Sequence, residues 1–203
     1  MSSDNNGTEN KVIFLGEAGV GKTTLIKVSI GQKFDKVYNS SISLSFNPKQ
    51  IIHNNKKYTF NLWDTIGQEK YRSLTKIFYK KSKIIIFVYD ITNKNSFKNL
   101  EYWINSVNTE LGDEKYIKAI VGNKSDLYLK EEIKEDEAKE FAASKNAKFK
   151  LCSAKNDPLA FCKFLEELCI ECINNNDKEN IESNSSVKLN KKKTKNKKEK
   201  CNC

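Results

Sequence analysis

The sequence lacks the features that would place it inside a membrane or in a secreted class. Its longest apolar run covers residues 84–89, well short of the roughly 18 apolar residues that span a bilayer. The first ten residues are polar and lack the apolar centre of a secretory signal, and the start Met1-Ser2 does not fit N-myristoylation. With 38% hydrophobic residues, we expect one soluble domain of about 170 residues followed by a tail.

Histidine is also scarce, and the six cysteines do not form a recognisable framework. Without a secretory signal a disulfide scaffold is not expected. Cys169 and Cys172 have C-x-x-C spacing, but on a helical pattern without a second ligand pair, and the only histidine, His53, is distant. A metal site and buried helix cysteines are the two interpretations, and burial is favoured.

The positive charge is concentrated at one end of the chain. Residues 187–203 contain eight lysines and one glutamate, so they carry +7 of the formal net charge of +10. This uneven distribution argues against nucleic-acid binding by the whole protein. A nucleic-acid role for the tail alone remains an alternative to a membrane role.

The chain is organised around residues 16–23, which read GEAGVGKT and fit the phosphate-loop spacing G-x-x-x-x-G-K-[ST]. An apolar run at 11–15 predicts a strand before the loop, and residues 24–33 predict a helix after it. Glycines let backbone N–H groups converge on a phosphate, and the helix N-terminus adds positive potential. Lys22 is expected along the outer phosphates and the Thr23 hydroxyl on Mg²⁺. The predicted nucleotide-binding residues here are Ala18, Gly19, Val20, Gly21, Lys22, Thr23 and Thr24.

The rest of the pattern alternates strands with helices. Two strands are predicted to form a hairpin around Asn54-Asn55, a pair that tolerates the positive φ of a tight turn. Asp157-Pro158 predicts the start of the last helix. The other elements are expected as strands at 46–52, 57–63, 83–89, 116–122 and 148–152, and helices at 96–111 and 131–144.

This alternation predicts an α/β fold of three layers. A mostly parallel six-stranded sheet carries helices on both faces, and the hairpin adds one antiparallel edge strand. Ligands in such sheets bind at the carboxyl ends of the strands. We expect residues 1–10 to be disordered, residues 11–173 to form the domain, and residues 174–203 to form a disordered Lys-rich tail.

A second motif identifies the base. In Asn123-Lys124-Ser125-Asp126, the Asp126 carboxylate can accept from both N1–H and the 2-amino group of guanine, which adenine does not offer. Ser153-Ala154-Lys155, at the end of the last predicted strand, is expected to bring a backbone N–H to the guanine O6. A phosphate-loop kinase of nucleosides is a further class, but we find neither a lid nor a second substrate pocket in the sequence.

These motifs resemble those of the small GTPases of the Ras superfamily, and within them the Rab family. The resemblance covers residues 11–173 and continues at the C-terminus. It is carried by both nucleotide motifs and by the segments Trp63-Asp64-Thr65, Gln68-Glu69-Lys70-Tyr71-Arg72, Tyr89-Asp90-Ile91-Thr92 and Cys201-Asn202-Cys203.

The resemblance implies further site residues. Phe34 packs against guanine, Ser41 ligates Mg²⁺, and Asp64 holds a Mg²⁺-bound water. The Gly67 N–H meets the γ-phosphate, and Gln68 orients the attacking water. The effector surface is implied at Ile42, Phe46, Trp63 and Phe78, although aromatic residues on a hairpin face are also consistent with plain core.

The chain departs from the family pattern at several positions. Ser41-Ile42-Ser43 replaces the usual Thr-Ile-Gly, Ile66 replaces an alanine, and Lys81 replaces a glycine. Ile66 and Ser43 favour an alternative, a guanine-nucleotide-binding module with little or no intrinsic hydrolysis. The retained Gln68 favours the enzyme.

The family implies a GTPase switch with GTP or GDP and Mg²⁺ bound. It further implies an exchange factor, a GTPase-activating protein, effectors and a prenyl-binding chaperone, and a role in vesicle traffic without nucleic acid. Prenylation of Cys201 and Cys203 implies lipid anchoring at the cytoplasmic face of an endomembrane or the plasma membrane, with a cytosolic pool.

Overall fold

The computed structural model describes residues 10–35, 45–65 and 78–195. Several predicted functional residues lie outside these ranges, so their predicted roles stay predictions: Ser41, Ile42, Ser43, Ile66, Gly67, Gln68, Cys201 and Cys203.

The six-stranded sheet has the order β2-β3-β1-β4-β5-β6. Only the pair β2–β3 is antiparallel, which confirms the predicted hairpin at the edge of a parallel sheet. β1 lies inside the sheet, so its residues are buried on both faces and read as a continuous apolar run. The strands are β1 (Asn10–Leu15), β2 (Ser45–His53), β3 (Lys56–Asp64), β4 (Ser82–Asp90), β5 (Ile117–Asn123) and β6 (Lys148–Leu151).

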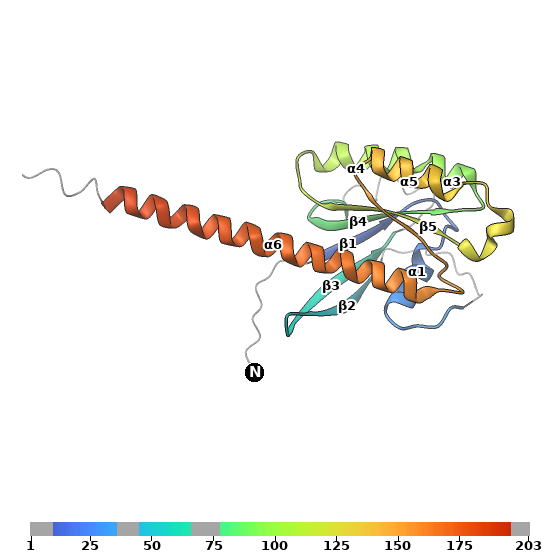
Figure 1. The fold of residues 1–203 in the computed structure, drawn as a ribbon, viewed down its shortest axis with the longest axis horizontal. Coiled ribbons are helices and arrows are strands. Elements are labelled where there is room, and N and C mark those ends of the chain that lie inside the picture. The colour runs from blue at the N-terminus through green and yellow to red at the C-terminus, as the bar shows by residue number, and fades with distance from the viewer. Residues whose placement is uncertain (1–9, 36–44, 66–77, 196–203) are drawn as a thin grey trace, which may run out of the picture.

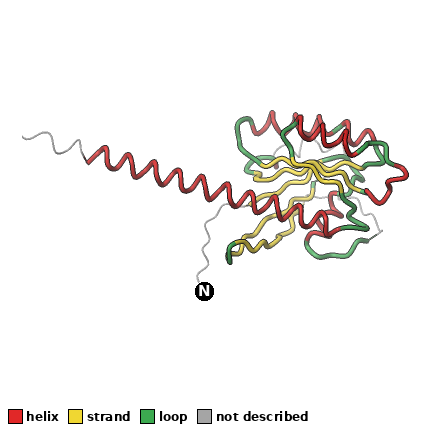
Figure 2. The backbone as a smooth tube through the Cα atoms, viewed as in Figure 1, coloured by secondary structure: helices red, strands yellow, loops and turns green. Residues whose placement is uncertain are grey.

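Helices cover both faces of the sheet, as Figures 1 and 2 show. α1 (Lys22–Ser29) and α6 (Pro158–Lys195) pack on the face to which Val12 and Phe14 point. The opposite face receives α3 (Lys94–Lys98), α4 (Leu100–Leu111) and α5 (Glu135–Ser144). The two resulting cores confirm the three-layer architecture.

Local backbone geometry explains where the elements turn. Asn54 and Asn55 have φ of 49° and 58°, the left-handed pair that a tight hairpin requires, as predicted. The helix predicted at 96–111 instead comprises two helices that meet at Asn99. The first of them begins earlier because the Asn93 side chain accepts a hydrogen bond from the Ser96 N–H at 3.1 Å.

Helix α6 begins as predicted and ends later. Asp157 caps it by accepting from the Ala160 N–H at 3.2 Å. Up to residue 178, where the description of burial ends, its last buried residues are Cys172 and Ile173. Its backbone stays helical to Lys195 and projects away from the domain (Figure 1). This differs from the disordered tail predicted from residue 174. The chain has no glycine or proline after Pro158 to stop the helix.

Within residues 10–35, 45–65 and 78–195, no helix has a stretch that is both long enough and apolar enough to cross a bilayer.

Lys81 provides a stability test. Its φ of 62° is left-handed, a conformation that strains residues with a Cβ. We expect Lys81→Gly to raise the free energy of unfolding by about 0.5–1 kcal/mol, the relief of strain exceeding the added chain entropy. The matched control is Lys80→Gly, which relieves no positive φ and should lower stability. Urea unfolding of both variants checks this, and equal losses would contradict it.

Candidate functional site

The phosphate loop between β1 and α1 depends on two glycines. Gly16 has φ of 141° and Gly21 has φ of 101°, both unfavourable for other residues. A Cβ on Gly16 would collide with the Val88 carbonyl oxygen, and one on Gly21 would collide with the side-chain amide of Asn123. The loop is therefore packed against the ends of β4 and β5, while Ala18 and Gly19 remain exposed at its tip.

Lys22 is a buried cation inside this loop. Its ammonium donates to the carbonyl oxygens of Gly16 and Glu17, both at 2.8 Å. Burial lowers the pKa of Lys22 to about 8, although the nearby carboxylates of Asp64 and Glu17 oppose that shift. The site therefore holds a poorly solvated positive charge, which an anion at the loop would stabilise.

The Thr23 hydroxyl and the Asp64 carboxylate meet next to this lysine. The hydroxyl donates to Asp64 Oδ2 at 2.7 Å, which joins the start of α1 to the end of β3. Thr24 follows on the same helix and is partly buried. Hydroxyl and carboxylate oxygens are the ligands that Mg²⁺ prefers, so the donors present fit this ion.

Asn123, the last residue of β5, connects three segments. Its side-chain amide donates to the Val20 carbonyl oxygen at 2.9 Å, and its side-chain oxygen accepts from the Ala154 N–H at 3.1 Å. The phosphate loop, β5 and the loop before α6 are thus held together at the carboxyl edge of the sheet. The two motifs that the sequence separates by a hundred residues form one site.

Asp126 is oriented by the loop that follows β6. Its carboxylate accepts from the Ser153 hydroxyl at 2.5 Å, and the Lys155 ammonium lies 4.0 Å away. Neither contact follows from the spacing of the two motifs. The carboxylate is fixed before any base is present, because the hydroxyl holds one of its oxygens.

Sequence analysis missed two contacts that position this site. The Trp103 indole on α4 donates to Glu17 Oε1 of the phosphate loop at 3.1 Å. Lys124, with φ of 68°, places its ammonium 2.6 Å from Asp90 Oδ2. The sequence indicated neither contact. Trp103 matched only the apolar spacing of a helix, and Lys124 and Asp90 belong to two separate segments of the sequence.

The three predicted effector aromatics gather on the hairpin side. Phe46 and Trp63 are paired across β2 and β3 with ring centroids 5.3 Å apart, and Phe78 lies 5.9 Å from Trp63. Phe46 is 55% exposed, whereas the other two are partly buried. The cluster is therefore an accessible aromatic face, with the Lys11 ammonium 4.7 Å from the Trp63 ring.

Two other predictions have different outcomes. Phe34 lies after α1 with 38% of its surface exposed, and its role at the base stays a prediction. Cys169 and Cys172 are buried, and burial raises the pKa of the Cys172 thiol to about 11. The burial of both thiols in α6 agrees with their interpretation as buried helix cysteines.

Comparison with known proteins identifies close relatives of this chain. A sequence model described as the Ras family matches residues 11–170. The human Ras-related protein Rab-22A is 38% identical over 148 residues, which cover 73% of this chain and 76% of that protein. Mouse Rab-22A gives the same identity and coverage.

The buried lysine predicts a pH dependence in the nucleotide-free protein. Between pH 8 and 10.5 the unfolded chain keeps the Lys22 proton while the folded chain has lost it. Stability should therefore rise with pH through this window, by on the order of 3 kcal/mol in total relative to Lys22→Met. Urea unfolding of both proteins from pH 7.5 to 10.5 measures this difference.

The matched control for that experiment is Lys27→Met, which removes an exposed lysine from the same helix. The difference in free energy of unfolding between Lys27→Met and the unmodified protein should not change with pH over the same range. A flat difference for Lys22→Met as well would show that the lysine does not carry a buried charge.

Proposed function

The chain belongs to the Ras family of small GTPases, within its Rab branch, and on this premise we propose how its own residues perform the reaction. The protein hydrolyses GTP to GDP and phosphate and acts as a switch that recruits effectors in membrane traffic. The single observation that carries the residue assignment is the Asn123 side chain, which joins the phosphate loop to the loop after β6.

The phosphate half of the site comes from the residues between β1 and α1. Backbone N–H groups of residues 18–24 and the start of α1 attract the phosphate oxygens. The Lys22 ammonium exchanges its two carbonyl partners for phosphate oxygens, which restores a charge that burial disfavours. Binding energy for the triphosphate is thereby concentrated on one buried cation.

The Mg²⁺ ligands in this proposal are the Thr23 hydroxyl and Ser41, with Asp64 acting through a bound water. The 2.7 Å contact between Thr23 and Asp64 supports the pair, because it already brings two oxygen donors together. When bound, the ion neutralises charge that develops on the phosphates.

The base half of the site is read by Asp126 and its neighbours. The Asp126 carboxylate accepts the two guanine N–H donors, while Ser153 holds it in place. A backbone N–H of the segment Ser153-Ala154-Lys155 faces guanine O6, and Lys124 and Lys155 flank the ring. Phe34 covers the opposite face of the base once the nucleotide is bound.

Hydrolysis and switching involve residues outside the described part of the chain. Gln68 orients the attacking water, and the Gly67 N–H contacts the γ-phosphate. Residues 34–46 and 64–81 become ordered by the triphosphate and are released after hydrolysis. The aromatic cluster of Phe46, Trp63 and Phe78 and the neighbouring Ile42 form the effector surface of the ordered state, supported by the exposure of Phe46.

The C-terminal cysteines attach the switch to a membrane. Two prenyl chains, on Cys201 and Cys203, anchor more stably than one, and the lysines of residues 188–200 attract anionic lipid. From residue 174 to Lys195 the helix adds about 30 Å between the domain and the anchor. The proposed location is the cytoplasmic face of an endomembrane or the plasma membrane, with a cytosolic pool held by a prenyl-binding chaperone. An exchange factor and a GTPase-activating protein act on the membrane form.

The guanine assignment predicts a change of base preference. Asp126→Asn replaces an acceptor by an amide, so GTP affinity should fall at least a hundredfold, about 3 kcal/mol, while xanthosine triphosphate binds better. The control is Ser153→Ala, which removes only the supporting hydroxyl and should weaken GTP by less than tenfold. Titration with labelled nucleotides checks both, and unchanged GTP affinity in the Asp126 variant would refute the assignment.

The anchor assignment predicts a change of location. With both terminal cysteines replaced by serine, the tagged protein should move to the cytosol, because the lysines alone bind membranes weakly. The control Cys162→Ser, a partly buried cysteine of α6, should leave the location unchanged. Cell fractionation measures this, and a double variant that still sediments with membranes contradicts lipid anchoring.

A further inference from the structure

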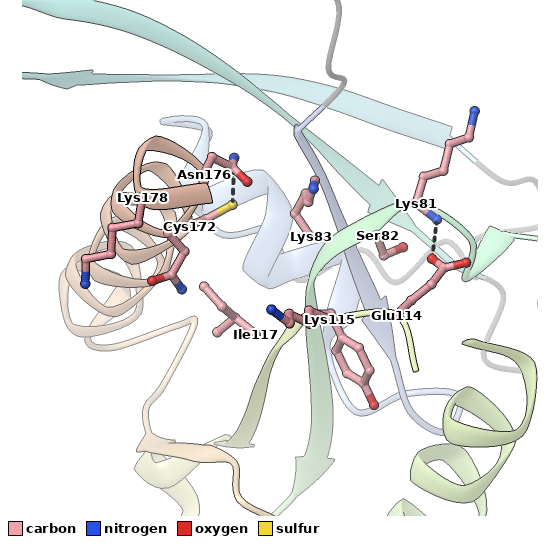
Figure 3. Close-up of a pocket in the computed structure, with 11 residues that line it drawn as sticks. Lys81, Ser82, Lys83, Glu114, Lys115, Ile117, Cys172, Asn176 and Lys178 are labelled. Carbon is pink, nitrogen blue, oxygen red and sulfur yellow. Dashed lines mark hydrogen bonds between the residues drawn. The ribbon is translucent and has the colours of Figure 1, made fainter. Parts of the chain in front are cut away.

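A cavity of about 580 Å³ lies at the end of the sheet opposite the nucleotide site. Its walls come from the start of β4, the segment that enters β5, and the part of α6 that leaves the domain (Figure 3). Strand β4 has nine residues, so the two sites are separated by roughly 25 Å along the sheet. The size falls within the range of about 300–1,000 Å³ that is typical of small-molecule pockets.

The lining of this cavity is strongly basic. Figure 3 shows lysines on several sides of it, and among the described lining residues Glu114 is the one carboxylate. Lys83 is partly buried and has no acidic partner within the described residues. The four lysines are Lys81, Lys83, Lys115 and Lys178.

The inner wall brings polar groups toward these charges. The Asn176 amide donates to the Cys172 sulfur at 3.8 Å, and Asn175 also lines the cavity. The Lys83 ammonium acts on the Cys172 thiol in the direction that lowers its pKa, against the dominant effect of burial. Lys83 therefore places positive charge near the inner wall, whereas the exposed Lys81 and Lys178 side chains extend outward from the rim (Figure 3).

The backbone conformation of Lys81 also supports a role for the basic lining of this cavity. A lysine occupies a left-handed position with φ of 62°, although glycine would adopt it without strain. The strained turn is stabilised by the Glu114 carboxylate, which accepts from the Lys81 backbone N–H at 3.3 Å. Backbone strain that persists at a pocket rim is characteristic of functional positions.

We propose that this cavity, at the base of the projecting part of α6, is a binding site for a small anion that carries two or more phosphate groups. The ligand is either a free phosphate ester or the headgroup of an anionic lipid. Lysines at the wall and rim of one open cavity suit a compact polyanion, because flexible ammonium groups can approach different phosphates. The site is separate from the nucleotide and does not depend on the lipid anchor.

The test uses the purified full-length chain with GDP bound and without prenyl groups. Calorimetry with inositol trisphosphate measures the free ligand. Sedimentation with phosphatidylcholine vesicles that contain phosphatidylinositol bisphosphate, against phosphatidylserine vesicles of equal surface charge, measures the headgroup. The pocket variant is Lys83→Gln with Lys178→Gln, and the control is Lys98→Gln with Lys163→Gln, which removes equal charge from exposed positions elsewhere.

We expect the pocket variant to bind inositol trisphosphate at least tenfold more weakly than the control variant. A matching loss on the bisphosphate vesicles identifies a lipid headgroup, whereas a loss for the soluble ligand alone identifies a free phosphate ester. GDP release should stay the same in both variants, which verifies folding. Equal losses of affinity in the pocket and control variants would show that binding depends only on net charge or on the tail. Polyglutamate that competes as well as inositol trisphosphate would show that the site does not select phosphate. Either result overturns the proposal.

Discussion

The structure depends on one buried amide, the side chain of Asn123. It uses both of its polar atoms, donating to Val20 in the phosphate loop and accepting from Ala154 in the loop before α6. A buried amide left with an unpaired atom is costly, so these bonds fix the three segments in a single arrangement. Gly21 is part of the same constraint, because any side chain there would occupy the position of the amide.

The site built around this amide is charged in a way that favours a ligand. The Lys22 ammonium is buried, its pKa is lowered, and its hydrogen-bond partners are neutral carbonyl oxygens. Burial of this charge therefore carries an electrostatic cost, which phosphate oxygens would offset. The hydrogen bond between Trp103 and Glu17 ties the loop to α4.

The sheet separates two chemically distinct ends. The proposed guanine and phosphate site lies at the carboxyl ends of the strands, where such sheets commonly place ligands. The basic cavity and the root of the projecting helix lie at the amino ends of β4 and β5. The nine residues of β4 separate the two sites by roughly 25 Å, so a ligand at one end does not touch the residues at the other end.

The sequence by itself determined the fold class, the edge hairpin and the composition of the nucleotide site. These are local properties: β1 and β4 are buried on both faces and read as apolar runs, and Asn54-Asn55 accepts left-handed φ without help from other residues. Only the tertiary structure decided that Ser153 orients Asp126 and that Trp103, 86 residues away from Glu17, holds the phosphate loop. It also decided the cavity that β4, the entry to β5 and α6 form together. Periodicity and turn preference act within a few residues, whereas these features arise where distant segments meet, and no local pattern encodes that meeting.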